Sequence, residues 1–545
     1  MTELLKAKKL ILPCLAALAG AVLLGSTATS SAQVTGSGAR VGMVNAASAA
    51  AAPPGVDVLQ SPDIPGVPAL PGPVASPAQP SSNIGILEVS PDQGVAGTPM
   101  TISGSGLPAN ASVELTWSTA DATWMVQTEA DTVNYRGSTD NYFSVVLDTT
   151  TTNAGGAFKV ALKAPVDFGG LHDIYAVIKG TEDAHGGFLL MRTITVTPSS
   201  GPVGTPITIT YSGLGASLYT GGASLLYDNH YVGEMMANWT RGTARAVIRA
   251  SGGVGPHTIQ IGNAISYLYL NVPQSPIPYT NGFHVTFSVT KDDGPPPASI
   301  AWPVSVAPTI SARTTLQATG LATNSKVIAS LATTDGPVNT SVALSASGFT
   351  SNAPISMVWS TVVGNRVNCK STCWAFASTP LGTAKPAGGA LQTNISVPDG
   401  LGGWHVVQLM QNGQQLAQIP FYVEESIVGQ GVSSVVLKEG QPFTIHIKGV
   451  GWTQLDNTVG VDYDNSYMGY GCGFNSNGDV LLHLIATGGP GTHLIDLYPM
   501  LYSLSPSFAD TPYGMVPVLT YAQDYPGLAL GYHLPSLHFA ITIVK

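Results

Sequence analysis

Two short segments each combine a carboxylate, an amide and two aromatic rings within five residues. They are Tyr227-Asp-Asn-His-Tyr231 and Tyr463-Asp-Asn-Ser-Tyr467. Such groups could hold a sugar or a Ca²⁺ ion. The structural alternative is a two-residue β-hairpin, because both central residues of that turn need a positive φ, which Asp and Asn tolerate. We favour the turn and interpret four residues as hairpin-turn residues: Asp228, Asn229, Asp464 and Asn465.

Four histidines recur in similar surroundings, each shortly after a Gly-Gly pair and before a run of alternating apolar residues. They are His172, His257, His405 and His493. A histidine in each module suggests a metal ligand, but side chains in separate domains would not converge on one ion. We therefore expect satisfied histidines at strand edges, and we predict no metal ligand and no cofactor.

The cysteines suggest a disulfide rather than a metal site. Cys369 and Cys373 lie four residues apart in Cys-Lys-Ser-Thr-Cys, and Cys472 lies far from both. An exported chain would allow a local disulfide between Cys369 and Cys373. A zinc site is the alternative, which the lack of a nearby His pair disfavours. The sequence assigns no role to Cys472.

Catalytic signatures are missing from the sequence. We find no Gly-x-Ser-x-Gly, His-Glu-x-x-His, phosphate-binding loop or dinucleotide Gly-x-Gly-x-x-Gly motif. No pair among the 31 acidic residues is singled out by its context. We predict that the protein is not an enzyme. An extracellular hydrolase with an unrecognised site is the least favoured alternative.

Two long loops, 121–152 and 498–532, are rich in aromatic residues. Insertions on a β-sandwich commonly carry recognition, and Tyr offers a large contact at low entropic cost. These side chains could bind a ligand or pack against a neighbouring domain, and we favour packing. The candidate residues are Trp124, Tyr135, Tyr142, Tyr502, Tyr513, Tyr521 and Tyr525.

The elements that position these residues are repeated. Residues 227–261 return without a gap as 463–497, with twelve of 35 positions identical. A segment that recurs in this way is a structural module used twice. Apolar residues alternate with Thr, Ser or His after Pro99, Pro206 and Pro442, which is the pattern of half-buried antiparallel strands. With 62 Gly, 40 Pro and only 10% charged residues, the composition also favours strands.

Two module types alternate along the chain in the order A-B-A-B, as expected from duplication of a two-domain unit. Trp117 in the first type A module matches Trp359 in the second, and we expect both to lie in a core. The second type B module carries a long Tyr/Pro-rich insertion. The predicted domains are 86–197 (A1), 198–291 (B1), 337–424 (A2) and 425–545 (B2), with a linker and a degenerate strand pair at 292–336.

One of these segments carries a family resemblance. The opening Thr197-Pro-Ser-Ser-Gly-Pro-Val-Gly-Thr-Pro, the Asp-Asn hairpin and the strand after Gly255-Pro-His257 resemble the extracellular immunoglobulin-like repeats of bacteria called IPT/TIG. The resemblance covers most of 86–291 and, more loosely, 337–545. It implies an all-β chain of tandem immunoglobulin-like sandwiches. It implies little about function, because such modules serve in adhesins, surface layers and enzyme appendages.

The N-terminus reads as an export signal. Three lysines precede an apolar run and a small-residue exit, so we predict a Sec-type signal peptide over 1–32, cleaved near Ala32. The Pro/Ala/Gly-rich segment 33–85 is expected to be a disordered linker. We expect no membrane span in the mature chain. A net charge of -10, without a basic run after residue 9, makes nucleic acid an improbable partner.

Repetition without a catalytic signature favours a non-enzymatic secreted or cell-surface protein that acts as a spacer, adhesin or envelope-assembly component. Its partners would be other surface proteins or copies of itself. The alternative is a carbohydrate-binding protein that uses the Tyr-rich loops.

Overall fold

We analysed a computed structural model of the chain. It describes residues 55–129, 132–217, 220–263, 270, 282–309, 325–364, 374–429, 435–505 and 508–545. These residues form strands and loops, with two short 3-10 helices, η3 (Phe474–Ser476) and η4 (Pro526–Leu530). None of the helices in this part of the chain has the length and apolar character needed to cross a membrane.

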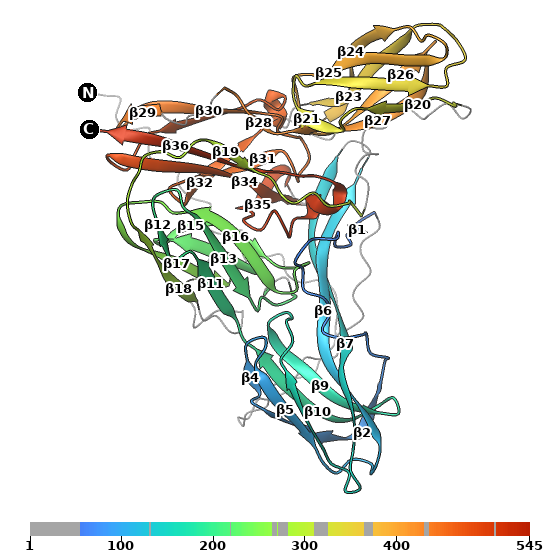
Figure 1. The fold of residues 1–545 in the computed structure, drawn as a ribbon, viewed down its shortest axis with the longest axis vertical. Coiled ribbons are helices and arrows are strands. Elements are labelled where there is room, and N and C mark those ends of the chain that lie inside the picture. The colour runs from blue at the N-terminus through green and yellow to red at the C-terminus, as the bar shows by residue number, and fades with distance from the viewer. Residues whose placement is uncertain are drawn as a thin grey trace, which may run out of the picture. The chain divides into compact units, whose positions relative to one another are not determined.

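Four β-sandwiches share one strand topology (Figure 1). B1 shows it most simply. Its first sheet has the order β11-β13-β16 and its second the order β12-β18-β17-β14-β15, with only the β12–β18 pair parallel. The bounds are β11 (Thr193–Thr197), β12 (Ser200–Gly201), β13 (Pro206–Ser212), β14 (Gly222–Tyr227), β15 (His230–Met236), β16 (Thr243–Arg249), β17 (Gly255–Asn263) and β18 (Phe283–Val289).

A2 repeats this pattern strand for strand, as β20-β22-β25 and β21-β27-β26-β23-β24. The chain is therefore a series of immunoglobulin-like sandwiches, as predicted. The bounds in A2 are β20 (Ile328–Leu331), β21 (Asp335–Pro337), β22 (Ser341–Ser347), β23 (Ile355–Gly364), β24 (Trp374–Ala384), β25 (Ala390–Ser396), β26 (Gly403–Gln411) and β27 (Gln414–Glu424).

A1 adds length and extra strands to the pattern. Its β6 and β7 form a hairpin far longer than the equivalent β23–β24 hairpin of A2, β1 pairs with β6, and β2 pairs with β10. The bounds are β1 (Asp57–Val58), β2 (Gln79–Ile86), β3 (Glu88–Ser90), β4 (Gln93–Gly94), β5 (Pro99–Gly104), β6 (Ser112–Thr128), β7 (Val133–Thr151), β8 (Phe158–Lys163), β9 (Gly170–Ile178) and β10 (Thr181–Leu190).

B2 carries β35 as an extra strand on β34, and β19 pairs with β36. The predicted insertion therefore extends the second sheet of this module. The bounds are β19 (Ser299–Ala301), β28 (Ser426–Ile427), β29 (Val435–Lys438), β30 (Pro442–Lys448), β31 (Thr458–Tyr463), β32 (Ser466–Cys472), β33 (Val480–Ile485), β34 (Gly491–Ser505), β35 (Phe508–Pro517) and β36 (Ser536–Val544).

Each sandwich has its own core, built by period-two alternation. In β22, Val342, Leu344 and Ala346 are buried, and Ala343 and Ser345 between them are exposed. Trp117 and Trp359 are both buried in the cores of their modules. Alternation places one row of side chains between the sheets and the other row in water.

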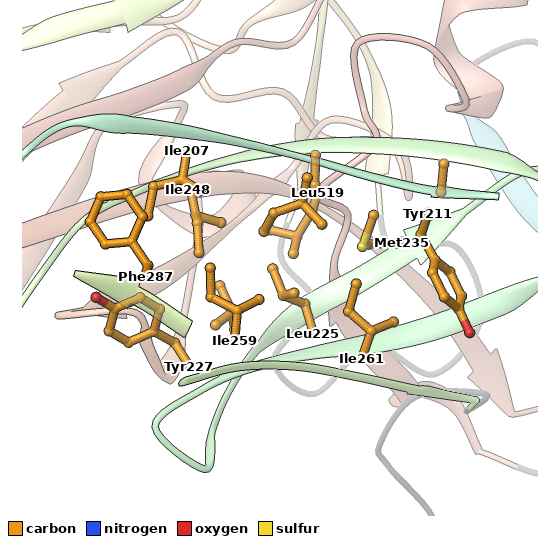
Figure 2. Close-up of a cluster of buried hydrophobic side chains, with 14 of the residues drawn as sticks. Ile207, Tyr211, Leu225, Tyr227, Met235, Ile248, Ile259, Ile261, Phe287 and Leu519 are labelled. Carbon is orange, nitrogen blue, oxygen red and sulfur yellow. The ribbon is translucent and has the colours of Figure 1, made fainter. Parts of the chain in front are cut away.

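The core of B1 is completed by B2. Leu519, which is 3% exposed, joins the B1 cluster together with Leu494, Tyr498 and Ala540. Figure 2 shows Leu519 among the B1 side chains, with Ile248 and Met235 to either side of it in this view. The two B-type modules therefore share apolar packing and are not independent of each other.

Several strands lie outside the predicted domain limits. The first strand of B1, β11, precedes residue 198, and β20 begins nine residues before 337. The segment 292–336 thus supplies the first strand of A2, while its β19 pairs with B2. Local strand patterns were too short there to show which sheet they would join.

The prediction of a disordered 33–85 segment is wrong for the part that the structure describes. Leu59 and Ile64 are buried, and β1 and β2 pair with strands of A1. Proline lowers the entropy that a chain loses on ordering, so a Pro-rich segment can be held along a sheet edge at modest cost. The predicted signal peptide, 1–32, lies outside the described residues.

Candidate functional site

The first Asp-Asn segment forms the turn between β14 and β15. Asp228 and Asn229 have φ values of 50° and 66°, the left-handed values that this two-residue hairpin requires. One Asp228 carboxylate oxygen, Oδ2, lies 2.5 Å from His257 Nδ1, and the other accepts a 2.8 Å hydrogen bond from the Thr258 amide. His257 Nε2 lies 2.7 Å from the Gly253 carbonyl oxygen. The carboxylate thus joins the hairpin to β17.

The second segment repeats this geometry in B2. Asp464 Oδ2 lies 2.6 Å from His493 Nδ1, Oδ1 accepts from the Leu494 amide at 2.9 Å, and His493 Nε2 lies 2.9 Å from the Gly489 carbonyl oxygen. Both ring nitrogens of His493 face acceptors, and one of the two is a carboxylate. Burial alone would lower the pKa of His493, but the bond to Asp464 and its charge outweigh burial and raise it. Each Asp–His pair serves its own module.

The same motif explains the repeated tyrosine and glycines. Tyr227 stacks on His257 with ring centroids 5.4 Å apart, and Tyr463 stacks on His493 at 5.6 Å. A Cβ atom at Gly252 would lie 2.5 Å from the ring of His257. Gly488 stands in the same relation to His493. The motif therefore has a packing explanation, and its clearest sequence signal was the spacing of 29 residues between Asp and His in both copies.

The two turns differ in what their asparagines contact. Asn229 accepts a 3.0 Å hydrogen bond from Gln260 within B1. Asn465 instead donates to the Arg249 carbonyl oxygen at 2.7 Å and to the Ser251 hydroxyl at 2.8 Å. The second hairpin is thus part of the contact between B1 and B2.

A buried ionic group crosses the same contact. Arg249 lies 2.7 Å from Asp496 and donates to the Phe539 carbonyl oxygen at 2.7 Å, and His538 Nδ1 lies 2.6 Å from Asp496. Burial would raise the pKa of Asp496, but the charges of Arg249 and His538 hold it below its usual value. Burial and the neighbouring charge of Asp496 instead raise the pKa of Asp462 far above its usual range. The pKa values of these two neighbouring acids are thus shifted in opposite directions.

The type A histidines are stacked on the core tryptophans. Trp117 and His172 have ring centroids 4.2 Å apart, and Trp359 and His405 are 4.8 Å apart. Both ring nitrogens of each histidine lie within hydrogen-bond distance of backbone carbonyl oxygens. Burial lowers the pKa of His405 to about 4. These side chains are enclosed in the core and are not arranged as open metal ligands.

One buried apolar cluster draws on all four modules. We call it the shared cluster. Its aromatic members include Trp124 of A1, Trp239 of B1 and Trp404 of A2. Leu59 and Ile64 join it from the N-terminal segment, and the largest share comes from B2: Leu455, Leu501, Val518, Tyr525, Leu528, Ala529, Leu530, Tyr532 and Leu534.

Hydrogen bonds between modules accompany the apolar contacts of the shared cluster. The Trp124 indole donates to Asp524 at 2.6 Å, the Trp404 indole to the Leu530 carbonyl oxygen at 3.2 Å, and the Tyr135 amide to the Gln454 side chain at 2.9 Å. Burial raises the pKa of Asp524 to about 7. The long β6–β7 hairpin therefore carries A1 aromatics into contact with B2.

The aromatic loop residues singled out in the sequence do not gather at one open site. Trp124 and Tyr525 are buried in the shared cluster and Tyr135 packs against it. Tyr521 shares a 2.7 Å hydrogen bond with Ser536, and Tyr142 is a partly exposed residue of β7. The side chains of Tyr502 and Tyr513 lie outside the described part of the chain.

The predicted disulfide partners, Cys369 and Cys373, also lie outside the described residues. Cys472 ends β32, and its sulfur lies 3.3 Å from the Thr458 hydroxyl.

Three groups that could hold a metal ion lie together although they are distant in sequence. Donor atoms of Asp335, Glu424 and His533 are all within 4.8 Å of one another, and His533 Nε2 is 3.4 Å from Glu424. Sequence reasoning missed this set because the residues come from different modules. Partly exposed acids beside a histidine also form ordinary ion pairs, so the set alone does not assign a metal.

Comparison with known proteins adds little. No family model and no curated protein matches the chain. The native conformation of E. coli alpha-2-macroglobulin matches 83% of this chain at 8% identity and a TM-score of 0.15. Salmonella alpha-2-macroglobulin reacted with methylamine matches 85% at 9% identity and 0.16. The chain spans only 30% and 31% of those two chains.

The ectodomain fragment D1–D4 of ICAM-5 matches 80% of this chain and 99% of its own length, at 11% identity and a TM-score of 0.16. Scores this low carry no argument about function. The immunoglobulin-like assignment rests on the strand topology described above.

Proposed function

We propose that the chain is a non-enzymatic exported protein, secreted or held at the cell surface, in which immunoglobulin-like modules form a scaffold for contacts with other surface proteins. The observation that carries the proposal is the shared cluster, to which all four sandwiches contribute buried side chains. Modules joined in this way keep fixed positions. A spacer, adhesin or envelope-assembly component requires that property, and we propose this class of role.

The hydrogen bonds of four aspartates support the proposal. Asp228, Asp464, Asp496 and Asp524 all bond to neighbouring residues of the scaffold. The repeated motifs therefore stabilise hairpin turns and contacts between modules. We further propose that the modules belong with the IPT/TIG repeats they resemble.

Carbohydrate binding is the second candidate. A sugar platform needs aromatic rings that face solvent, whereas Trp124 and Tyr525 pack inside the shared cluster. Among the described members of the set, Tyr142 is 39% exposed, and Tyr135 and Tyr521 are half-buried. The burial favours the scaffold over the sugar platform.

Immunogold labelling of intact cells, combined with fractionation, tests the proposal. We expect labelling at the surface, or the protein in the medium with residues 1–32 removed. Retention in the cytosol would contradict the proposal. A glycan array with the full chain separates the two candidates, since binding that is lost in Tyr142→Ala would favour the carbohydrate reading.

A further inference from the structure

B2 carries an exposed apolar groove along β32 and β33. The groove has a volume of about 690 Å³ and is lined mainly by both strands, with His483 of β33 and the preceding Ser476 and Asp479 as its polar members. Met468 and Tyr470 on β32 are 55% and 49% exposed, and Leu481 on β33 is 52% exposed. β32 is an edge strand without a charged residue. Natural edge strands usually carry charges, prolines or a cover that blocks pairing, so this edge is unusual.

The equivalent surface of B1 is covered. Val232 and Glu234 occupy the positions of Met468 and Tyr470, and they are 0% and 1% exposed. The cover is segment 517–520 of B2. Val518 forms a parallel bridge with Glu234, the Leu519 amide donates to the Glu234 carbonyl oxygen at 2.9 Å, and the Met236 amide donates to the Thr520 hydroxyl at 3.1 Å.

Two equivalent glycines, Gly233 in B1 and Gly469 in B2, have different surroundings at the covered edge of B1 and the open edge of B2. A Cβ atom at Gly233 would lie 2.9 Å from the Pro517 carbonyl oxygen and 3.0 Å from Leu519. The equivalent Gly469 has nothing within 4 Å. Gly471 stands in B2 where Met235 fills the interior of B1, and in B2 the side chains of Leu482 and Val480 fill that position instead. The B2 edge therefore has an unoccupied position above the strand at Gly469.

A1 covers its own equivalent edge in a related way. The Val146 amide donates to the Pro73 carbonyl oxygen and the Ala75 amide donates to the Ser144 carbonyl oxygen, both at 2.8 Å, and Val74 bridges Val145 on β7. The covering segments of A1 and B1 both contain Pro-Val, at 73–74 and 517–518. The A1 bridge is antiparallel and leaves Val74 62% exposed, whereas the B1 bridge is parallel and buries Val518 completely, so the chain covers this edge twice with an uncharged segment but in different orientations.

We propose that the β32–β33 groove of B2 binds an uncharged segment of another protein, which adds to the β32 edge and places an aliphatic side chain where Leu519 lies in B1. Main-chain hydrogen bonds along the edge would supply affinity, and the open position beside Gly469, whose equivalent Gly233 faces Leu519, would accept the side chain. The groove adjoins an existing contact, since Tyr467 of β32 meets Tyr231 of β15 with ring centroids 6.1 Å apart. This inference rests on the proposed scaffold function and names its partner class.

A second copy of the chain is a poorer occupant. Its segment 517–520 is already packed on its own B1. In the chain itself, Leu494, Tyr498 and Ala540 of B2 also pack against B1. The equivalent residues of B1 are Thr258, Gly262 and Thr286, so the B1 module of a second copy could not offer β32 the same apolar face. The partner segment must therefore come from a different protein.

The test uses the full chain and two probes: a fluorescent synthetic peptide of residues 515–523, and a displayed library of random nonapeptides. We expect saturable peptide binding that slows amide exchange in 466–472, and enrichment of uncharged sequences with aliphatic residues. Met468→Asp should weaken binding at least about tenfold, because a carboxylate would be buried against the added strand. The control Val254→Asp changes an exposed apolar residue of a B1 loop and should leave binding unaltered.

Three results would overturn the inference. In the first, neither the peptide nor any enriched library sequence loses binding in Met468→Asp. In the second, binding leaves amide exchange in β32 unchanged. In the third, the wild-type chain forms a dimer that Met468→Asp dissociates, which would make a second copy the occupant. All three leave the surface location proposed above untouched, because labelling of intact cells measures it separately.

Discussion

Removing the Leu519 side chain tests whether B2 completes the core of B1. Leu519 is 3% exposed and packs in the B1 cluster with Ile248 and Met235 (Figure 2). Leu→Ala at a buried site costs about 2–5 kcal/mol, from the lost transfer energy and the cavity left behind. The site lies where two modules meet, and partial closure of the gap should keep the cost near the lower half, about 2–3.5 kcal/mol.

The assay is amide hydrogen exchange combined with denaturant unfolding of Leu519→Ala. Exchange should accelerate in β14, β15 and β16, although the substitution lies in B2, because the free energy of local opening falls with the lost packing. Leu481→Ala is the matched control. Leu481 is 52% exposed on β33, so its truncation should cost less than about 0.5 kcal/mol.

The reasoning would be refuted if Leu519→Ala cost no more than Leu481→Ala, or if the faster exchange stayed within B2. Either result would mean that B1 folds without the contribution of the 517–520 segment.

Three further predictions concern ionisable groups. Asp464→Asn should cost about 1–3 kcal/mol, because it leaves His493 without its anion. Because the pKa of His493 is raised in the folded state, its contribution to stability is complete below the unfolded pKa and is lost as pH rises through the folded pKa. The Asp464→Asn variant should therefore lose this pH dependence of the free energy of unfolding, measured by urea titration. An unchanged pH profile would contradict the Asp464–His493 pairing. Burial raises the pKa of Glu425 from 4.5 to about 8, so the free energy of unfolding of the wild type should decrease as pH rises between these values. The Glu425→Gln variant should show a smaller decrease. An equally large decrease in the variant would show that Glu425 is ionised without cost. Arg249→Ala should cost about 3–5 kcal/mol by leaving Asp496 buried without its cation, whereas the exposed Arg245→Ala should be nearly neutral; equal thermal stabilities of the two variants would contradict the buried pair.

The sequence predicted the repeated architecture because strand alternation and turn chemistry are local. Asp228 and Asn229 carry the positive φ values that their types suggested, and the alternating residues after Pro206 lie in β13. The A-B-A-B order followed from matching residues at fixed shifts. Each of these features depends on the chain within one module.

Contacts between modules could not be read in the same way. The Trp124–Asp524 hydrogen bond joins residues 400 positions apart, and nothing near either residue marks the partner. The same holds for Leu519, which looks like an ordinary loop residue until B1 packs around it. The groove of B2 became visible only when Met468 and Val232, equivalent in sequence, proved to be oppositely exposed.

The N-terminal segment shows a different limit. Its composition indicated that the segment could not form a core of its own. This agrees with the structure, in which Leu59 and Ile64 are buried against other modules. A segment without a core can still be ordered when a neighbouring sheet edge supplies partners for its backbone.

Amide exchange in Trp124→Ala measures most directly whether the four modules act as one body. Trp124 belongs to A1, and its indole bonds to Asp524 of B2 within the shared cluster. Loss of this side chain should accelerate exchange in 517–534 of B2 and around Trp239 of B1, far along the chain from the substitution. Acceleration confined to β6 and β7 would contradict the account.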